Sequence, residues 1–413
     1  MKKVNLGLLP RLILGILIGM LIGSLGGWFG ISDNVVFVYL IKTLATFSSL
    51  FSVFLKFMIP LLILSFVSVS LAELGRKANK LFLITLGLAY VSTIIAGFIA
   101  YGVGSFTLPN LITTINSSDA TFATFDPIFT IEVDPVFGIM TALILSFVLG
   151  IGMANLKSTK LYDIMKDIQD IVAMTLTKVI IPVIPYYIAA QFSTIAATGE
   201  LWETVKMFAI LYIMILCLQW VFLAVEFGTA SIWCKKNEYK KIRNILPAYF
   251  TALGTQSSAA TIPVNLECAY KNGVSEDVAN FCIPLCATIH LAGDTICLVL
   301  GTMGIMLSVG MTPTFAGFVP FILMLGVTMV AAPGVPGGGV MAALGIITSM
   351  FGFTDLMQSL IISLHFSQDS FGTAANVTGD QAISFIVDHI DRKDNDKKEE
   401  PDDAFVKEME DAE

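Results

Sequence analysis

The sequence predicts an all-α integral membrane protein with eight transmembrane helices, two re-entrant helical hairpins and an inverted repeat. Composition gives the membrane class, because 55% of the 413 residues are hydrophobic, 14% are charged and the mean hydropathy is +0.81. Two apolar segments of the C-terminal half are interrupted near their midpoints, at 254–263 and 333–339. Their arms of about a dozen residues are shorter than the ~20 helical residues that cross a hydrocarbon core. Each segment is therefore expected to enter the membrane and turn back.

Long apolar runs predict the helices of the N-terminal part. The run 81–109 carries no charge, which is typical of helical spans rather than of alternating barrel strands. Lysines and arginines precede the first run and follow the second, fourth and sixth, whereas the loop 110–134 has four acidic residues and no basic one. The positive-inside rule then predicts a multi-pass protein of the plasma (inner) membrane with both termini in the cytoplasm. The expected helices are 12–31, 36–73, 81–108, 135–155, 171–195 and 204–230.

The pattern changes after residue 243. Polar stretches at 288–294 and 376–380 predict a break inside each of the last two long helices. Paired interruptions in two corresponding halves of a membrane protein are typical of a transport site near the bilayer midplane. The expected order is a hairpin at 245–270, a helix at 278–308, a hairpin at 319–352 and a helix at 355–388.

Polar side chains gather on the last of these helices. Asp369 and Asp380 are 11 residues apart, close to three helical turns, so they share a face. Thr373 and Asn376 add a hydroxyl and an amide to the same stripe. Carboxylates inside a membrane are costly and are expected to face a cavity, a cation or a partner, although a purely structural hydrogen bond is the alternative.

The hairpin tips carry small and polar residues. Ser257 and Ser258 lie at the first tip, where hydroxyls and loosened backbone amides can bind a carboxylate or simply cap a helix. The glycines 337–339 either let the second hairpin close over a solute or make a tight turn.

The sequence also contains one pattern that could form a transition-metal site. Cys282, Cys286, His290 and Asp294 recur every four residues, and thiolates with imidazole suit zinc or copper. The expected helix break crosses this series and separates its members. The six cysteines imply no disulfide framework, nucleic-acid binding has no support, and no grouping of nucleophile, base and orienting residue predicts an enzyme.

Four segments resemble a known family. They are 256–264, 287–289, 334–337 and 369–380, and they are similar to those of the dicarboxylate/amino acid:cation symporters, the glutamate-transporter fold. The chain resembles a divergent member of the neutral amino acid (serine/threonine) type. The resemblance implies a homotrimeric scaffold in the lipid bilayer and a transport domain that moves like an elevator.

The resemblance also divides the chain. Scaffold helices are expected at 1–80 and 135–203. The transport domain is expected to take helix three with its extracellular loop at 81–134, helix six with its cytoplasmic loop at 204–244, and a core of hairpins and helices at 245–390. The tail 391–413 holds 5 basic and 11 acidic residues and is expected to be disordered and cytoplasmic.

Site residues follow by position from the same resemblance. Asp369 would hold the ammonium of an amino acid substrate, and Ser258 and Thr373 its carboxylate. The implied substrate residues are Ser257, Ser258, Asp294, Val335, Gly339, Asp369, Thr373 and Asn376. The implied Na⁺ ligands, many through backbone carbonyls, are Asp380, Asn376, Cys286, His290, Thr288, Met329, Val330 and Ala332, with Tyr90 and Thr93 at a further cation site. No organic cofactor is implied, and H⁺ is an alternative coupling ion.

Two departures from the family pattern matter. Members with acidic substrates carry an arginine where this chain has Gly372. In this chain the side-chain carboxylate of an acidic substrate would therefore lack a bidentate partner. The stretch 290–294 replaces the family's Asn-Met-Asp-Gly-Thr, which removes oxygen ligands from a further sodium site. Asp294 has three interpretations: it recognises a hydroxyl or ammonium on the substrate, it is a protonatable coupling group paired with His290, or it restores the missing cation site.

These observations predict a secondary transporter that couples a neutral or polar amino acid to a cation. The alternative transporter is a proton-coupled or sodium-independent carrier of a cationic amino acid or another small organic solute. A channel or a substrate-sensing protein that kept the fold without concentrative transport is the alternative from another class.

Overall fold

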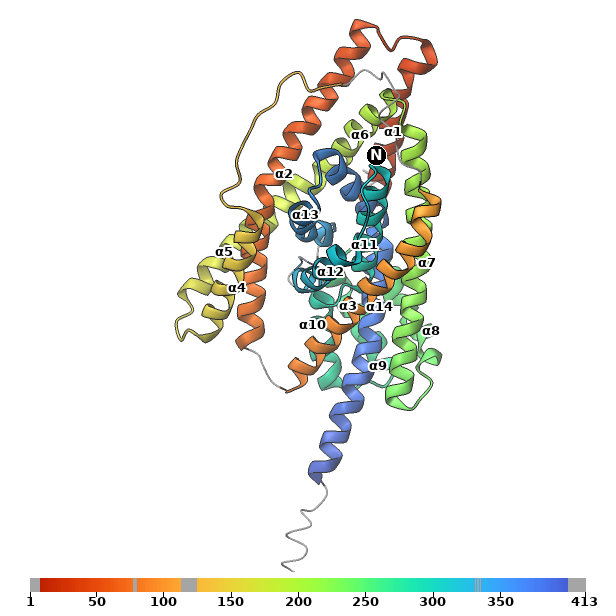
Figure 1. Cartoon of the computed structure of the whole chain (residues 1–413). Coiled ribbons are helices and arrows are strands. Elements are labelled where there is room, and N and C mark those ends of the chain that lie inside the picture. The colour runs from red at the N-terminus through yellow and green to blue at the C-terminus, as the bar shows by residue number, and fades with distance from the viewer. Residues whose placement is uncertain are drawn as a thin grey trace, which may run out of the picture.

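The computed structural model describes residues 8–76, 80–112, 125–330, 332, 334 and 336–399. The secondary structure of these residues is helical throughout, without a strand. The helices form an elongated body from which the end of α14 extends (Figure 1).

One group of helices packs around α2. α1 lies along α6, and α2 contacts α4, α5 and α6. A β-carbon at Gly15, Gly19 or Gly23 would collide with carbonyls of α6, so these glycines allow α1 to approach it closely. One π-helical turn, Leu176–Ile180, joins α5 to α6, so this run begins at 160 rather than at the expected 171. The helices are α1 (Leu8–Phe29), α2 (Val35–Arg76), α4 (Ile139–Asn155), α5 (Lys160–Thr175) and α6 (Ile181–Ala197).

A second group packs around α14. α11 and α14 contact each other, and α3 and α7 pack against both. A 3₁₀ turn, Glu238–Lys241, leads from α7 into α8. The helices are α3 (Lys80–Leu111), α7 (Leu201–Cys234), α8 (Ile242–Thr255), α9 (Ser258–Lys271), α10 (Glu276–Ile289), α11 (Ala292–Ser308), α12 (Phe315–Met329), α13 (Gly338–Phe351) and α14 (Asp355–Glu399).

The interrupted segments form two pairs of short helices, α8–α9 and α12–α13. Their members have 14 or 15 residues, or about 21 to 23 Å at 1.5 Å per residue, which is less than a hydrocarbon core of about 30 Å. The first pair turns at Gln256, whose φ of 54° is left-handed and whose Nε2 donates to Ser370 Oγ at 2.7 Å. The turn before α13 uses Gly337 at φ 72°.

One of the two predicted breaks in long helices is confirmed and the other is wrong. α10 ends at Ile289 and α11 begins at Ala292, as expected. α14 is continuous through 376–380, because Thr378 bonds its own helix at Ala374 O (2.8 Å) and the Asn376 side chain finds partners on α11, so no turn has to unwind. The expected disorder of the tail stays a prediction: residues 391–399 continue α14 as a helix, and the rest of the tail lies outside the described residues.

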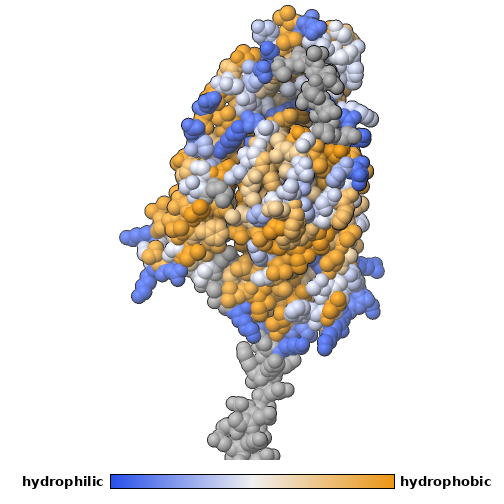
Figure 2. All heavy atoms as spheres, viewed as in Figure 1, coloured by the Kyte–Doolittle hydropathy of each residue, from blue (hydrophilic) through white to orange (hydrophobic). Residues whose placement is uncertain are grey.

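Within the part of the chain that the structure describes, six helical runs are long and apolar enough to cross a membrane. Large apolar side chains cover the middle of the body and hydrophilic residues gather toward its ends (Figure 2), as in a multi-pass membrane protein. The shorter apolar helices are Thr141–Asn155, Phe315–Met329 and Gly338–Phe351. The total of eight transmembrane helices stays a prediction. The six runs are Pro10–Phe29, Val35–Glu73, Lys80–Leu111, Lys160–Ala197, Leu201–Cys234 and Glu276–Ser308.

Candidate functional site

The turns of both helix pairs, the α10–α11 break and α14 enclose a small cavity. Its volume is about 20 Å³, room for roughly one water molecule. Five of the residues predicted to bind substrate line it: Ser258, Asp294, Gly339, Asp369 and Thr373. The other lining residues are Gln256, Ala287, Leu291, Ala332 and Gly334.

Two hydrogen bonds tie described residues of the turn before α13 to other elements around this cavity. The Ser257 hydroxyl donates to Gly334 O at 2.9 Å, and its oxygen also accepts from the N–H of Ala260 at 3.3 Å, which caps α9. The Gly337 N–H donates to Asp369 Oδ2 at 2.7 Å. The carboxylate predicted to hold a substrate ammonium is therefore already bound by the backbone of the turn. Val335, the other predicted residue of this turn, lies outside the described residues.

A buried imidazole, that of His365, contacts Asp294, one of the residues that line the cavity. His365 Nε2 lies 2.9 Å from Asp294 Oδ1, and Asn376 Nδ2 donates to Asp294 Oδ2 at 2.8 Å. Asn376 Oδ1 accepts from the Gly293 N–H at 2.7 Å, which ties α14 to the start of α11. Ligand atoms of Asp294, His365 and Asp369 all lie within 4.8 Å of one another. We call these three residues the cavity cluster.

Asp294 also fills the space beside Gly372. A β-carbon at Gly372 would lie 3.1 Å from Asp294 Oδ1 and 3.4 Å from Gln368 Nε2. Gln219 Nε2 donates to Gln368 Oε1 at 2.9 Å and to Gly293 O at 3.0 Å, so these amides hold the same region together. The position of the family's arginine is thus packed against a fixed carboxylate.

A second buried imidazole, that of His290, lies at the α10–α11 break. His290 Nε2 is 3.0 Å from Glu226 Oε1 and 3.1 Å from Ser92 Oγ, and its Nδ1 is 3.1 Å from Asp380 Oδ1. The Ser92 hydroxyl donates to Glu226 Oε1 at 2.6 Å. We call Ser92, Glu226, His290 and Asp380 the helix cluster. It joins α3, α7 and α14 at the α10–α11 break.

Asp380 retains one free acceptor in this cluster. Its Oδ2 is buried and has no hydrogen-bond partner among the residues that the structure describes. Buried carboxylate oxygens are normally paired, so this atom fits a bound cation. The side chain of Asn376, another predicted ligand, is engaged by the Gly293 N–H and by Asp294 on α11.

The other predicted cation ligands are distributed over three places. Buried Cys286 Sγ lies 3.8 Å from Cys282 Sγ. Thr288, Val330 and Ala332 line a second, larger cavity, and Met329 ends α12. The series Cys282, Cys286, His290 and Asp294 does not converge, because the break directs His290 to Glu226 and Asp294 to His365.

The predicted pair Tyr90 and Thr93 bonds elsewhere. The Tyr90 hydroxyl donates to Leu323 O at 3.2 Å, and the Thr93 hydroxyl donates to Ala89 O at 2.9 Å. On this helix it is Ser92 that reaches His290.

Ser92, Glu226 and His365 were missed by sequence reasoning. Glu226 is a carboxylate inside the apolar run 204–230, and His365 interrupts the apolar run that leads into Phe366. An ionisable residue inside a predicted span is a usable signal for such groups. Ser92 had no comparable signal, because serines are common in membrane helices.

Comparison with known proteins decides the family. Residues 8–390 match the model of the sodium:dicarboxylate symporter family. The chain belongs to this family. It is 30% identical over 316 residues to the serine/threonine transporter SstT of Streptococcus suis (strain 05ZYH33), an alignment that covers 73% of this chain and 87% of the relative. It is 32% identical over 163 residues to an excitatory amino acid transporter of Caenorhabditis elegans, covering 39% of this chain and 32% of that protein.

Membership confirms the predicted resemblance and the broad class. The family is one of membrane symporters, and its relatives here are named as amino acid transporters. The chain is therefore a multi-pass membrane protein of a transporter family, with sodium coupling implied by the family.

Proposed function

We propose that this protein couples the uptake of a small neutral amino acid to sodium ions and moves it by an elevator motion. The observation that carries the proposal is the small cavity in which Asp369 lies with Ser258 and Thr373 between the two helical turns. Asp369 holds the substrate ammonium, and the two hydroxyls donate to its carboxylate. On substrate binding, the ammonium replaces the Gly337 N–H on Asp369, and the turn before α13 adjusts over it.

The cavity cluster selects the side chain. Asp294 is fixed by His365 and Asn376, and with Asp369 it repels a substrate carboxylate. A hydroxyl on the substrate side chain can donate to Asp294, which lines the cavity. The name of the Streptococcus suis relative, a serine/threonine transporter, supports this class.

A sodium ion would be held by Asp380 Oδ2 with carbonyls near Cys286, His290 and Asn376. Carbonyls near Thr288, Met329, Val330 and Ala332 would hold another. When bound, sodium would compensate the negative charge of these buried oxygens. Substrate binding would thereby become linked to the sodium gradient. The other carboxylate oxygen of Asp380 is not free for the ion, because His290 contacts it and also contacts Glu226.

The two helix groups supply the moving parts. The scaffold consists of α1, α2 and α4–α6, it forms a homotrimer, and the transport domain consists of α3 and α7–α14. Both helix pairs are re-entrant, and both termini are cytoplasmic. A cross-group ion pair, Lys56 with Asp355, then breaks whenever the transport domain moves.

Proton coupling is the second candidate. The helix cluster favours it, since an imidazole between two carboxylates inside a membrane is a group that can carry a proton. Replacing sodium by choline at constant pH separates the two candidates: uptake stops for a sodium symporter and continues for a proton symporter.

The test is uptake by purified protein in liposomes. Serine, threonine and alanine should accumulate under an inward sodium gradient, and glutamate and arginine should not. Asp369→Asn should abolish accumulation, because a neutral amide cannot pair with the ammonium. Exposed Asp277→Asn is the matched control and should leave it unchanged. Uptake retained by Asp369→Asn, or accumulation of glutamate, would contradict the proposal.

A further inference from the structure

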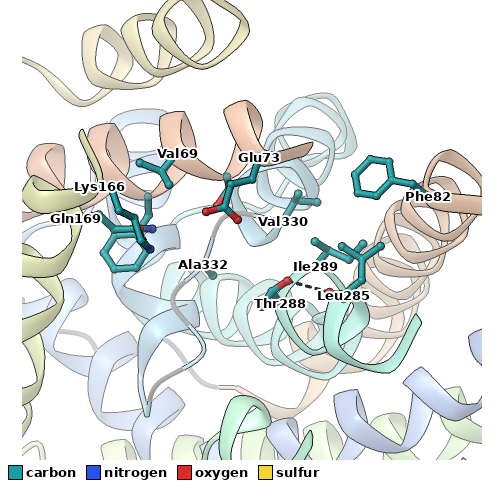
Figure 3. A pocket seen from close by; sticks show the side chains of 12 residues that line it. Val69, Glu73, Phe82, Lys166, Gln169, Leu285, Thr288, Ile289, Val330 and Ala332 are labelled. Carbon is teal, nitrogen blue, oxygen red and sulfur yellow. Dashed lines mark hydrogen bonds between the residues drawn. The ribbon is translucent and has the colours of Figure 1, made fainter. Parts of the chain in front are cut away.

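A second cavity lies between the two helix groups. It has a volume of about 210 Å³ and is bounded by α2 and α5 on one side and by α3, α10 and the end of α12 on the other (Figure 3). It lies near the ends of α2 and α5 that carry basic residues, the side predicted to face the cytoplasm. Ala332 lines both this cavity and the small one, so the turn before α13 forms part of the wall between them.

Two helix C-terminal ends contribute to the walls of this cavity. Leu285, Thr288 and Ile289 belong to the last turns of α10, and Val330 and Ala332 follow the end of α12. The C-terminal end of a helix has unpaired carbonyls and a partial negative charge, so two such ends face one space. The cavity is therefore suited to a cation rather than to an anion.

Glu73 adds a full charge from the other side. Figure 3 shows its carboxylate pointing into the space beside Thr288, Val330 and Ala332. One oxygen, Oε1, accepts from the Tyr162 hydroxyl at 2.7 Å, which fixes the carboxylate in place.

Lys166, the cation on the cavity wall, is directed along its own helix. Its ammonium donates to Gln169 Oε1 at 2.6 Å and lies 3.8 Å from Asp170 Oδ1. Lys166 therefore pairs with residues of α5 and not with Glu73. The Glu73 carboxylate can receive a cation that leaves the C-terminal ends of α10 and α12.

We propose that this cavity is the cytoplasmic release vestibule for the coupled cation, and that Glu73 receives the ion as it leaves the carbonyls near Thr288 and Ala332. The inference rests on the proposed sodium-coupled transport. Glu73 lies on the scaffold helix α2, so it does not travel with the transport domain. Glu73 can contact the ion only when the transport domain lies against the scaffold as in this structure. Its removal should therefore change the response to internal sodium and not the response to external sodium.

The test uses the full-length protein in liposomes and the variant Glu73→Gln. Glutamine keeps the acceptor for Tyr162 and removes the charge. The internal sodium concentration that half-inhibits uptake should rise on the order of fivefold, the factor that corresponds to the attraction of unit charges about 4 Å apart in water. The external sodium concentration for half-maximal uptake should change by less than about twofold, since Glu73 is remote from the ion on that side.

Two variants on the neighbouring helix are controls. Asp163→Asn removes an exposed carboxylate from α5 and should leave both sodium dependences unchanged. Tyr162→Phe removes the hydrogen bond to Glu73 and keeps its charge, so it should give less than about a twofold change.

Sodium binding is measured independently by thermal unfolding in detergent. Glu73→Gln should need more sodium than the wild type for half of the maximal stabilisation. Unchanged internal inhibition and unchanged stabilisation in Glu73→Gln, with sodium-dependent uptake by the wild type, would overturn the vestibule and leave the proposed function intact. Sodium-independent uptake by the wild type would overturn the proposed function, and this inference with it.

Discussion

The cavity cluster and the helix cluster are chemically alike and structurally different. Each places one imidazole among two buried carboxylates, His365 with Asp294 and Asp369 in the first, His290 with Glu226 and Asp380 in the second. The cavity cluster is covered by the turn before α13, through the Gly337 N–H on Asp369. The helix cluster is held by side chains of packed helices. The same kinds of group therefore border a small cavity in the first cluster and join packed helices in the second.

A glycine packs against each cluster and marks this difference. A β-carbon at Gly339, near the start of α13, would lie 3.2 Å from Asp294 Cγ and 3.3 Å from His365 Nε2. A β-carbon at Gly379, on α14, would lie 2.5 Å from Glu226 Oε2 and 2.7 Å from His290 Cε1. The first glycine belongs to an element that we propose to move, and the second to the central helix.

Exchanging each imidazole for glutamine should have the largest effects. His290→Gln leaves two buried carboxylates with a poorer partner, and removing one member of a buried charge network costs about 3–5 kcal/mol of stability. His365→Gln should cost less, because the cavity can admit water to Asp294. The melting temperature in detergent measures both. An equal loss in the two variants would show that the clusters do not differ in rigidity.

Exchanging each glycine for alanine should separate stability from binding. Gly379→Ala forces Glu226 and His290 apart, and overpacking of this kind costs about 1–3 kcal/mol. Gly339→Ala should lower the melting temperature less, because its β-carbon would lie 3.2–3.3 Å from the cavity cluster rather than 2.5–2.7 Å from the helix cluster. It should weaken substrate binding, because the added methyl group narrows the cavity that Gly339 lines. Thermal unfolding and substrate-induced stabilisation are the two measurements. The comparison fails if Gly339→Ala is the less stable protein.

Removing the charge of Asp294 should change selectivity more than stability. Asp294→Asn keeps a side chain that can bond His365 and Asn376 and removes the repulsion of a substrate carboxylate. The preference for serine over glutamate should fall about tenfold, or about 1.4 kcal/mol. Competition between the two amino acids in the liposome assay measures this ratio. A preference that does not change would assign Asp294 to another role among the three considered.

The ion pair between the helix groups should have the smallest effect. Lys56 and Asp355 are 40% and 51% exposed, and pairs of this exposure contribute about 0–1 kcal/mol. Lys56→Gln should therefore leave the melting temperature almost unchanged, whereas a change in the rate of uptake would show that the pair resists the motion. Asp355→Asn should reproduce the result.

The sequence predicted those parts of the fold that local physics controls. The Gly-Pro run of 333–339 and the turn at Gln256 interrupt helices wherever they are placed, and the break at 290–291 follows from polar residues in an apolar span. The same reasoning failed at 376–380. Asn376 and Asp380 are polar too, but their partners on α11 and at His290 satisfy them without unwinding α14. A polar stretch alone does not distinguish these two outcomes.

By itself the sequence determined the membrane class, the interrupted segments and the carboxylates of α14, because hydropathy, chain-breaking residues and helical spacing act within one segment. Only the tertiary structure decided that Glu226, Ser92 and His290 meet, that His365 holds Asp294, and that Glu73 faces the end of α12. The hydrogen bond between Ser92 and His290, for example, joins residues 198 positions apart in the chain. No local preference encodes such a contact. Burial selects these contacts, because a charged group taken out of water is stable only where the packing of other helices brings it a partner.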